Sequence, residues 1–351
     1  MTIKRKLHLE ALRIIAIYFV ILTHTGTRGF TYYTTLQPSV GYYFAMLIPL
    51  LCNICVPVFY MISGATMLSK DETPGQIWRR RIPKYLAVLV LATLGMYLYY
   101  GLKDDKAMSV VDFLRTLYSK NVIAPYWYLF SYLGFLILLP FLRKMIRNLT
   151  DREFVYLFLL HLVFSGLIPM GQYWLSGGQV YLNGSLNVSL VTMTIIIFPA
   201  AGYYIEHRAA LSGKQLGLLW GAAVLSLTAA VFMTHYKICL TGQMKESQVG
   251  TFYKSLCLIP SVAVYATMKK LFDRCTPPQW LQKGILSVGG CTFGIYLIEQ
   301  ILRERGYKVQ TFLSKWITEI PATLIYVTLV LIVGYVIVWI LKRIPGVKRF
   351  I

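Results

Sequence analysis

The chain has 351 residues, of which 57% are hydrophobic and 14% are charged, and it carries a formal net charge of +21. Apolar segments long enough to cross about 30 Å of hydrocarbon recur along its whole length, which excludes a water-soluble globular protein. The positive charge does not indicate nucleic-acid binding, because the basic residues cluster at the ends of apolar segments and form no soluble patch.

We predict one all-α integral membrane domain over residues 1–351, with about ten transmembrane helices and no internal repeat or soluble domain. The expected spans lie near residues 11–29, 41–68, 85–101, 125–142, 153–172, 187–205, 215–234, 250–268, 284–302 and 320–341. Basic residues precede the first span and follow the second, fourth, eighth and tenth. Under the positive-inside rule, both termini are therefore expected in the cytoplasm. The basic connections after the third and ninth spans do not follow this rule.

Two ionisable residues, Arg13 and His24, interrupt the first apolar segment. A central arginine costs about 3 kcal/mol in a membrane helix, so such residues indicate a functional site. Eleven residues complete about three helical turns, which predicts that both side chains share one face about 16 Å apart, with His24 deep in the membrane. The simpler alternative is that His24 packs between helices and that Arg13 extends to the cytoplasmic surface.

The same two residues and Glu10 argue against a cleaved signal peptide, so we expect a retained first helix. The six cysteines do not form a disulfide framework. No metal site is expected, because Cys52 and Cys55 lack a second pair of ligands and small apolar cysteines are common in buried helices.

The stretch LHLEALRIIAIYFVILTHTG, residues 7–26, resembles the opening helix of the acyltransferase-3 family. Members of this family are integral membrane enzymes that O-acylate bacterial surface polysaccharides and related acceptors. The family's hallmark is an arginine, ten intervening residues and a histidine, which are Arg13 and His24 here. Glu10 stands where the family has an acidic residue three positions before the arginine. A purely structural alternative for Glu10 is an ion pair with Arg13 at i,i+3.

Four further segments extend the resemblance. NICVPVFYMISGATML, residues 53–68, is similar to a second-span pattern that ends in Ser-Gly, here Ser63 and Gly64. PYWYLFSYLGFLILLPFLRK, residues 125–144, resembles an aromatic segment and places Trp127 and Tyr128 near the start of an outer helix. An interfacial aromatic belt is the alternative interpretation of these two side chains.

RRRIPKYL, residues 79–86, resembles a cytoplasmic motif of two arginines separated by two residues, with Arg81 in the first place and Lys84 in the second. Lysine keeps the charge but loses the planar fork of arginine. FGIYLIEQ, residues 293–300, resembles a late-span pattern that often ends in histidine, but Glu299 occupies that position here. A carboxylate is costly at membrane depth, but the position of Glu299 near the end of an expected span allows solvent contact.

Acyl transfer from a thioester to a hydroxyl requires a base and a group that stabilises developing negative charge. His24 suits the first task, while Arg13 stays cationic and suits substrate binding or charge stabilisation. Arg80, Arg81 and Lys84 suit the phosphates of coenzyme A, although basic residues beside a span also simply set topology.

The resemblance implies that acyl-CoA, most simply acetyl-CoA, enters from the cytoplasm. The acceptor would be a hydroxyl of a cell-surface glycan or a lipid-linked sugar, met towards the outer face of a bacterial inner or plasma membrane. Besides these substrates, membrane lipids are expected as partners, and nucleic acid is not. A transporter or flippase of a lipid-linked sugar, with Arg13, His24 and Glu299 along its pathway, is the alternative and would consume no acyl-CoA. A non-catalytic scaffold leaves the alignment of Arg13 with His24 unexplained.

Overall fold

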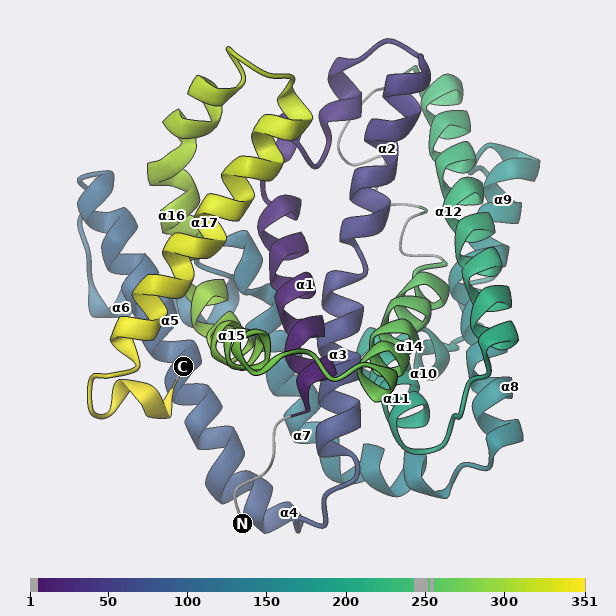
Figure 1. Cartoon of the computed structure of the whole chain (residues 1–351), viewed down its shortest axis with the longest axis horizontal. Coiled ribbons are helices and arrows are strands. Elements are labelled where there is room, and N and C mark those ends of the chain that lie inside the picture. Colours follow the sequence, from purple (N-terminus) through teal and green to yellow (C-terminus); the bar gives the residue numbers. More distant parts are fainter. Residues whose placement is uncertain (1–5, 243–251, 253–255, 351) are drawn as a thin grey trace. The chain divides into compact units, whose positions relative to one another are not determined.

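The computed structural model describes residues 6–242, 252 and 256–350, and every regular element in these ranges is helical, as predicted (Figure 1). The chain folds into two units, one formed by residues 1–67 and 149–341 and the other by residues 68–148 and 342–351.

The first unit is organised around the helix α1. Its helices are α1 (Leu7–Thr23), α2 (Val40–Cys52), α3 (Cys55–Met67), α8 (Asp151–Leu162), α9 (Ile168–Ser176), α10 (Ser189–Thr192), α11 (Thr194–His207), α12 (Gly213–Thr241), α14 (Leu258–Arg274), α15 (Gln279–Gly289), α16 (Thr292–Leu313) and α17 (Glu319–Leu341). The short 3-10 turns Gly26–Arg28 and Tyr32–Thr35 connect α1 to α2, and the π-helical turn Val163–Leu167 joins α8 to α9. Because α1 contacts α2, α3, α14, α15, α16 and α17, it lies in the interior of this unit.

Glycines allow α3 and α11 to pack closely. A Cβ atom added at Gly64 would lie 2.0 Å from the carbonyl oxygen of Pro199, and one added at Gly202 would lie 1.9 Å from that of Met61. Small residues at a helix interface let two backbones approach, which is how membrane helices gain packing energy without a hydrophobic driving force. The Ser-Gly pattern of the second expected span therefore has a packing role at its glycine.

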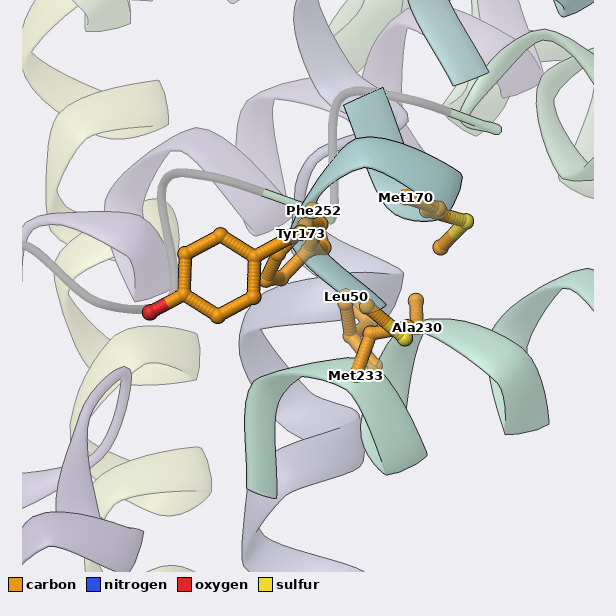
Figure 2. Close-up of a cluster of buried hydrophobic side chains, with 6 residues drawn as sticks. All are labelled: Leu50, Met170, Tyr173, Ala230, Met233 and Phe252. Atoms are coloured by element: carbon orange, nitrogen blue, oxygen red, sulfur yellow. The ribbon is translucent and has the colours of Figure 1, made fainter. Parts of the chain in front are cut away.

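A buried apolar cluster links α2, α9 and α12 (Figure 2). Its members are Leu50, Met170, Tyr173, Ala230, Met233 and Phe252. The rings of Tyr173 and Phe252 meet edge to face with their centroids 5.3 Å apart, a favoured arrangement for aromatic pairs.

The second unit contains α4 (Pro74–Gln76), α5 (Ile82–Lys103), α6 (Val110–Ser119) and α7 (Trp127–Asn148). A π-helical turn, Ile77–Arg81, runs directly between α4 and α5, and 3-10 turns occur at Ala124–Tyr126 and Val347–Arg349. Thr73 and Gln76 form a reciprocal capping box that starts α4. The tyrosine rings of Tyr85 and Tyr132 lie 5.0 Å apart where α5 packs on α7.

Six helical stretches among the described residues are long and apolar enough to cross a membrane. A seventh is added if α15 and α16, which are bent by 62°, form one crossing. Three other expected spans correspond to α1, α11 and α14, which have 17, 14 and 17 residues. The expected number of about ten crossings is therefore not confirmed, and the sides of the termini stay a prediction.

Candidate active site

The first helix ends earlier than expected. We expected a span as far as residue 29, but α1 ends at Thr23 and His24 caps it. The Thr25 hydroxyl donates to the carbonyl of Leu22 and accepts from the backbone N–H of Phe30, and Gly26 adopts a positive φ of 58°. These local bonds replace helical ones and turn the chain. His24 therefore lies at the end of α1 rather than within a longer helix, and its side chain is 22% exposed.

The imidazole of His24 faces a buried carboxylate. Its Nδ1 lies 2.8 Å from Oε1 of Glu299, whose side chain is fully buried on α16. Neither atom has a well-aligned hydrogen-bond partner among the described residues, so this contact is an ion-pair distance and not a regular hydrogen bond. The solvent contact that a position near a span end would allow is not observed, because Glu299 is buried. Because α16 continues to Leu313, Glu299 lies inside the helix and against α1, not near a span end.

Arg303 completes this site, and the sequence interpretation missed it. Its Nε donates to Oε2 of Glu299 at 2.7 Å, and its Nη1 donates to the backbone carbonyl of His24 at 2.5 Å. The available signal was the i,i+4 spacing of Glu299 and Arg303, which places opposite charges side by side on one helix face. In the sequence, Arg303 is one of the basic residues in the connection that follows the ninth expected span.

Arg13 is paired with Glu10 on the same helix, which is the structural alternative given for Glu10. Glu10 is buried, and a Cβ atom at Gly289 would lie only 3.0 Å from its backbone carbonyl, so α15 ends directly against it. Arg13 remains partly exposed. The described structure shows Arg13 beside Glu10 and His24 beside Glu299, and it does not bring the two motif residues into contact.

A second buried polar cluster surrounds the start of α1. Glu206 on α11 accepts a hydrogen bond from the Tyr265 hydroxyl at 2.9 Å, lies 3.0 Å from Nε2 of His8, and pairs with Lys6 at 2.5 Å. These contacts join α1, α11 and α14. Nothing in the sequence pattern linked these residues, because they come from three separate helices.

In the second unit, Arg81 is already paired with a carboxylate. Its Nε and Nη2 donate to Glu72 at 2.9 and 2.5 Å, and Nη2 of the buried Arg143 donates to the same carboxylate at 2.6 Å. The hydrogen bonds from Arg81 lower the pKa of Glu72 to about 2, with those from Arg143 adding to the effect. Arg80 and Lys84 are exposed.

The remaining predicted residues have local roles in the structure. The Ser63 hydroxyl donates to the Phe59 carbonyl of its own helix at 2.9 Å. Trp127 opens α7, as predicted, and is 46% exposed, while the ring of Tyr128 lies 6.1 Å from that of Trp127.

The model of the acyltransferase-3 family, described as an acyltransferase domain, matches residues 7–340. Comparisons with curated proteins and with solved structures gave no match. The matched range begins with α1 and reaches nearly to the end of α17, so it includes His24, Glu299 and the whole basic segment of the second unit. Together with the long apolar helices, this match identifies a multi-pass membrane protein. The chain belongs to the acyltransferase-3 family.

Proposed function

We propose that this protein transfers an acyl group, most simply acetyl, from acyl-CoA to a hydroxyl of a cell-surface glycan or lipid-linked sugar, with His24 as the general base. The observation that carries this proposal is the contact of 2.8 Å between the partly exposed imidazole of His24 and the buried carboxylate of Glu299. A base needs both access to a substrate and a group that orients it, and this pair supplies both.

The geometry supports a complete transfer step. In the proposed step, Nδ1 of His24 keeps its hydrogen and turns it onto Oε1 of Glu299, 2.8 Å away, which leaves the lone pair on Nε2. Nε2 takes the proton of the acceptor hydroxyl while its oxygen attacks the thioester carbonyl carbon. The C–S bond breaks, the CoA sulfur leaves with the electron pair, and the imidazolium returns its proton to that thiolate. The buried carboxylate stabilises the transient imidazolium, as in acyl-transfer enzymes that pair histidine with a carboxylate.

The basic residues of the second unit are proposed to bind the donor. Arg80 and Lys84 are exposed cations, and Arg81 would exchange Glu72 for a phosphate group of CoA. Arg13 would contribute to substrate binding or to charge stabilisation, after loosening its pair with Glu10. We further propose a bacterial inner or plasma membrane as the site of action, with a cytoplasmic donor.

The decisive experiment measures transfer of labelled acetyl from acetyl-CoA into alkali-labile ester, with the purified full chain and glycolipid extracted from the source membrane as acceptor. We expect His24→Ala to lower the rate by about 10² to 10⁴-fold, the usual contribution of a general base. His235→Ala is the matched control and should keep its activity, because His235 lies on α12 against Tyr42. Wild-type activity in a His24→Ala protein that elutes and melts normally would overturn the proposal.

The same assay separates an enzyme from a transporter. The buried charges of His24 and Glu299 also suit a substrate or proton pathway in a membrane protein. A transporter of lipid-linked sugar releases no free CoA, whereas the proposed enzyme releases one thiol for each ester formed.

A further inference from the structure

We propose that Arg303 is a positioning residue that holds the His24–Glu299 pair in register and balances the charge of the Glu299 carboxylate, so that the imidazole can act as a base. The inference rests on the proposed role of His24. It assigns to Arg303 two tasks, one geometric and one electrostatic.

The geometric task follows from the planar fork of the guanidinium. Nε of Arg303 donates to the side chain of Glu299 at 2.7 Å, and Nη1 donates to the backbone carbonyl of His24 at 2.5 Å. Nη2 donates to the side-chain oxygen of Gln300. The rigid guanidinium of Arg303 thus binds both the carboxylate of Glu299 and the backbone of His24, whose imidazole that carboxylate orients. Lysine, a single point charge, cannot reproduce these directions.

Neighbouring contacts hold Arg303 and the chain after His24 in place. The Tyr326 hydroxyl on α17 donates to the backbone carbonyl of Arg303 at 2.7 Å. Arg28 lies 4.5 Å from the ring centre of Tyr307, and its backbone carbonyl accepts from Thr323 at 2.6 Å. The end of α1 is therefore fixed to α16 and α17 around the pair.

The electrostatic task follows from how Glu299 is shared. Oε1 faces His24 and Oε2 faces Arg303, so the buried carboxylate already has a permanent cation. A buried carboxylate without one would draw a proton onto the imidazole. Among the described residues, Tyr326 on α17 interacts electrostatically with Arg303, Glu299 and Arg28, and Glu304 on α16 accepts a hydrogen bond from Gln300 at 2.9 Å.

The test uses the purified full chain with Arg303→Gln, Arg303→Lys and the exposed control Lys308→Gln, which removes a cation from the same helix. Initial rates of acetyl transfer are measured from pH 6 to pH 9.5. We expect Arg303→Gln to move the acid limb of the pH–rate profile to higher pH by about one unit. A neighbouring charge typically shifts the titration of a group by at least this amount. Arg303→Lys should keep the limb in place but lower the plateau. Lys308→Gln should match the wild type.

A second readout does not depend on activity. Diethyl pyrocarbonate modifies only unprotonated imidazole, so the pH dependence of His24 modification, followed by mass spectrometry, should show the same upward movement in Arg303→Gln. An unmoved midpoint in this variant overturns the inference, as does an equal loss of rate at every pH in both arginine variants. An active His24→Ala protein would instead overturn the proposed function, whereas the difference in the His24 modification midpoint between the wild type and Arg303→Gln would still report on Arg303.

Discussion

Glu72 determines what Arg81 can bind. Its carboxylate accepts hydrogen bonds from Nε and Nη2 of Arg81 and from Nη2 of Arg143, which is the arrangement that a phosphate group would adopt on the same side chains. Because the hydrogen bonds from Arg81 hold the pKa of Glu72 near 2, the carboxylate stays ionised throughout the neutral range. An anionic donor that uses Arg81 must therefore compete with an internal anion.

This competition predicts opposite effects for two substitutions. Glu72→Gln should bind CoA several-fold more tightly, since it frees Arg81 from its counter-charge. Replacing Arg81 and Lys84 together with Gln should weaken CoA binding by about 1–3 kcal/mol for each lost charge-assisted contact, and less so at high salt. Titration calorimetry of CoA on the detergent-purified proteins measures both.

Asp71→Asn is the matched control, because it removes the same charge from the adjacent residue, which is highly exposed and pairs with Arg147 instead. Its CoA affinity should change less than that of Glu72→Gln. Unchanged affinity in both the Glu72 variant and the double variant would show that Arg81 and Lys84 only set topology.

The sequence could predict local pairs between residues but not distant ones. The Glu10–Arg13 pair was foreseen because i,i+3 spacing alone brings the two side chains together. Glu299 stood out in the sequence as a charge in an apolar span, but its contact with His24 depends on how α16 packs against α1. Glu72 drew no attention, because its partner Arg143 lies on another helix and only the fold brings them together.

At the scale of elements, the contact between α3 and α11 depends on two glycines. A methyl group at Gly64 would lie 2.0 Å from a backbone oxygen of α11, which no side-chain rotation can relieve. The helices would have to separate and lose packing along their whole contact. A polar contact also joins these two helices: Nε2 of His207 on α11 lies 2.8 Å from the backbone carbonyl oxygen of Ala65 on α3.

Gly64→Ala should therefore destabilise the protein by about 1–3 kcal/mol or more, the usual cost of overpacking. Thermal unfolding of the purified protein in detergent measures this as a lower melting temperature. Gly221→Ala in α12 is the control, because a Cβ atom there has no neighbour within 4 Å. It should be neutral or stabilising by about 0.5–1 kcal/mol. Equal melting temperatures for the two variants would contradict the role of Gly64.

Hydropathy predicted where helices occur better than where they end. The start of α7 at Trp127 is correct, because Pro125 precedes it. The end of α1 was placed too late, since the hydroxyl of Thr25 and the left-handed Gly26 act locally within an apolar run. The end of α16 was placed too early, because the charges of Glu299 and Arg303 are satisfied by the protein itself.

At the scale of the whole molecule, several contacts bring helix ends together within the first unit. Lys6 at the start of α1 pairs with Glu206 at the end of α11. Lys270 near the end of α14 donates to the carbonyl of Leu211 at 2.9 Å, and His207 contacts the end of α3. The start of α1 and the ends of α3, α11 and α14 therefore lie on one side of this unit.

The C-terminal helix follows the same arrangement. Thr323, in the first turns of α17, donates to the backbone carbonyl of Arg28 just beyond the end of α1. Because α17 begins beside the end of α1 and packs along it, α17 runs antiparallel to α1, towards the start of α1. This antiparallel course predicts that the start of α1 and the end of α17 lie on the same side of the membrane, which the basic residues assign to the cytoplasm.

The shorter helices fit this topology. With a rise of 1.5 Å per residue, α1 spans about 26 Å and α11 alone about 21 Å. The extended backbone of Met193 separates α11 from α10, and residues 189–207 together span about 28 Å if treated as one helix. A break inside one crossing thus leaves two helices that are each too short to be recognised as a span.

Reporter fusions at three connections decide whether α11 crosses the membrane. In the predicted topology, a fusion after residue 180 lies outside and a fusion after residue 209 lies in the cytoplasm, so alkaline phosphatase should be active only at the first and a cytoplasmic fluorescent reporter only at the second. A fusion after residue 120 is the control and should behave like the one after residue 180. If only the six or seven long stretches crossed, no helix between residues 180 and 209 would do so, and both fusions would report the same side. That result would remove the crossing by α11 and, with it, the predicted alternation from α8 to α12.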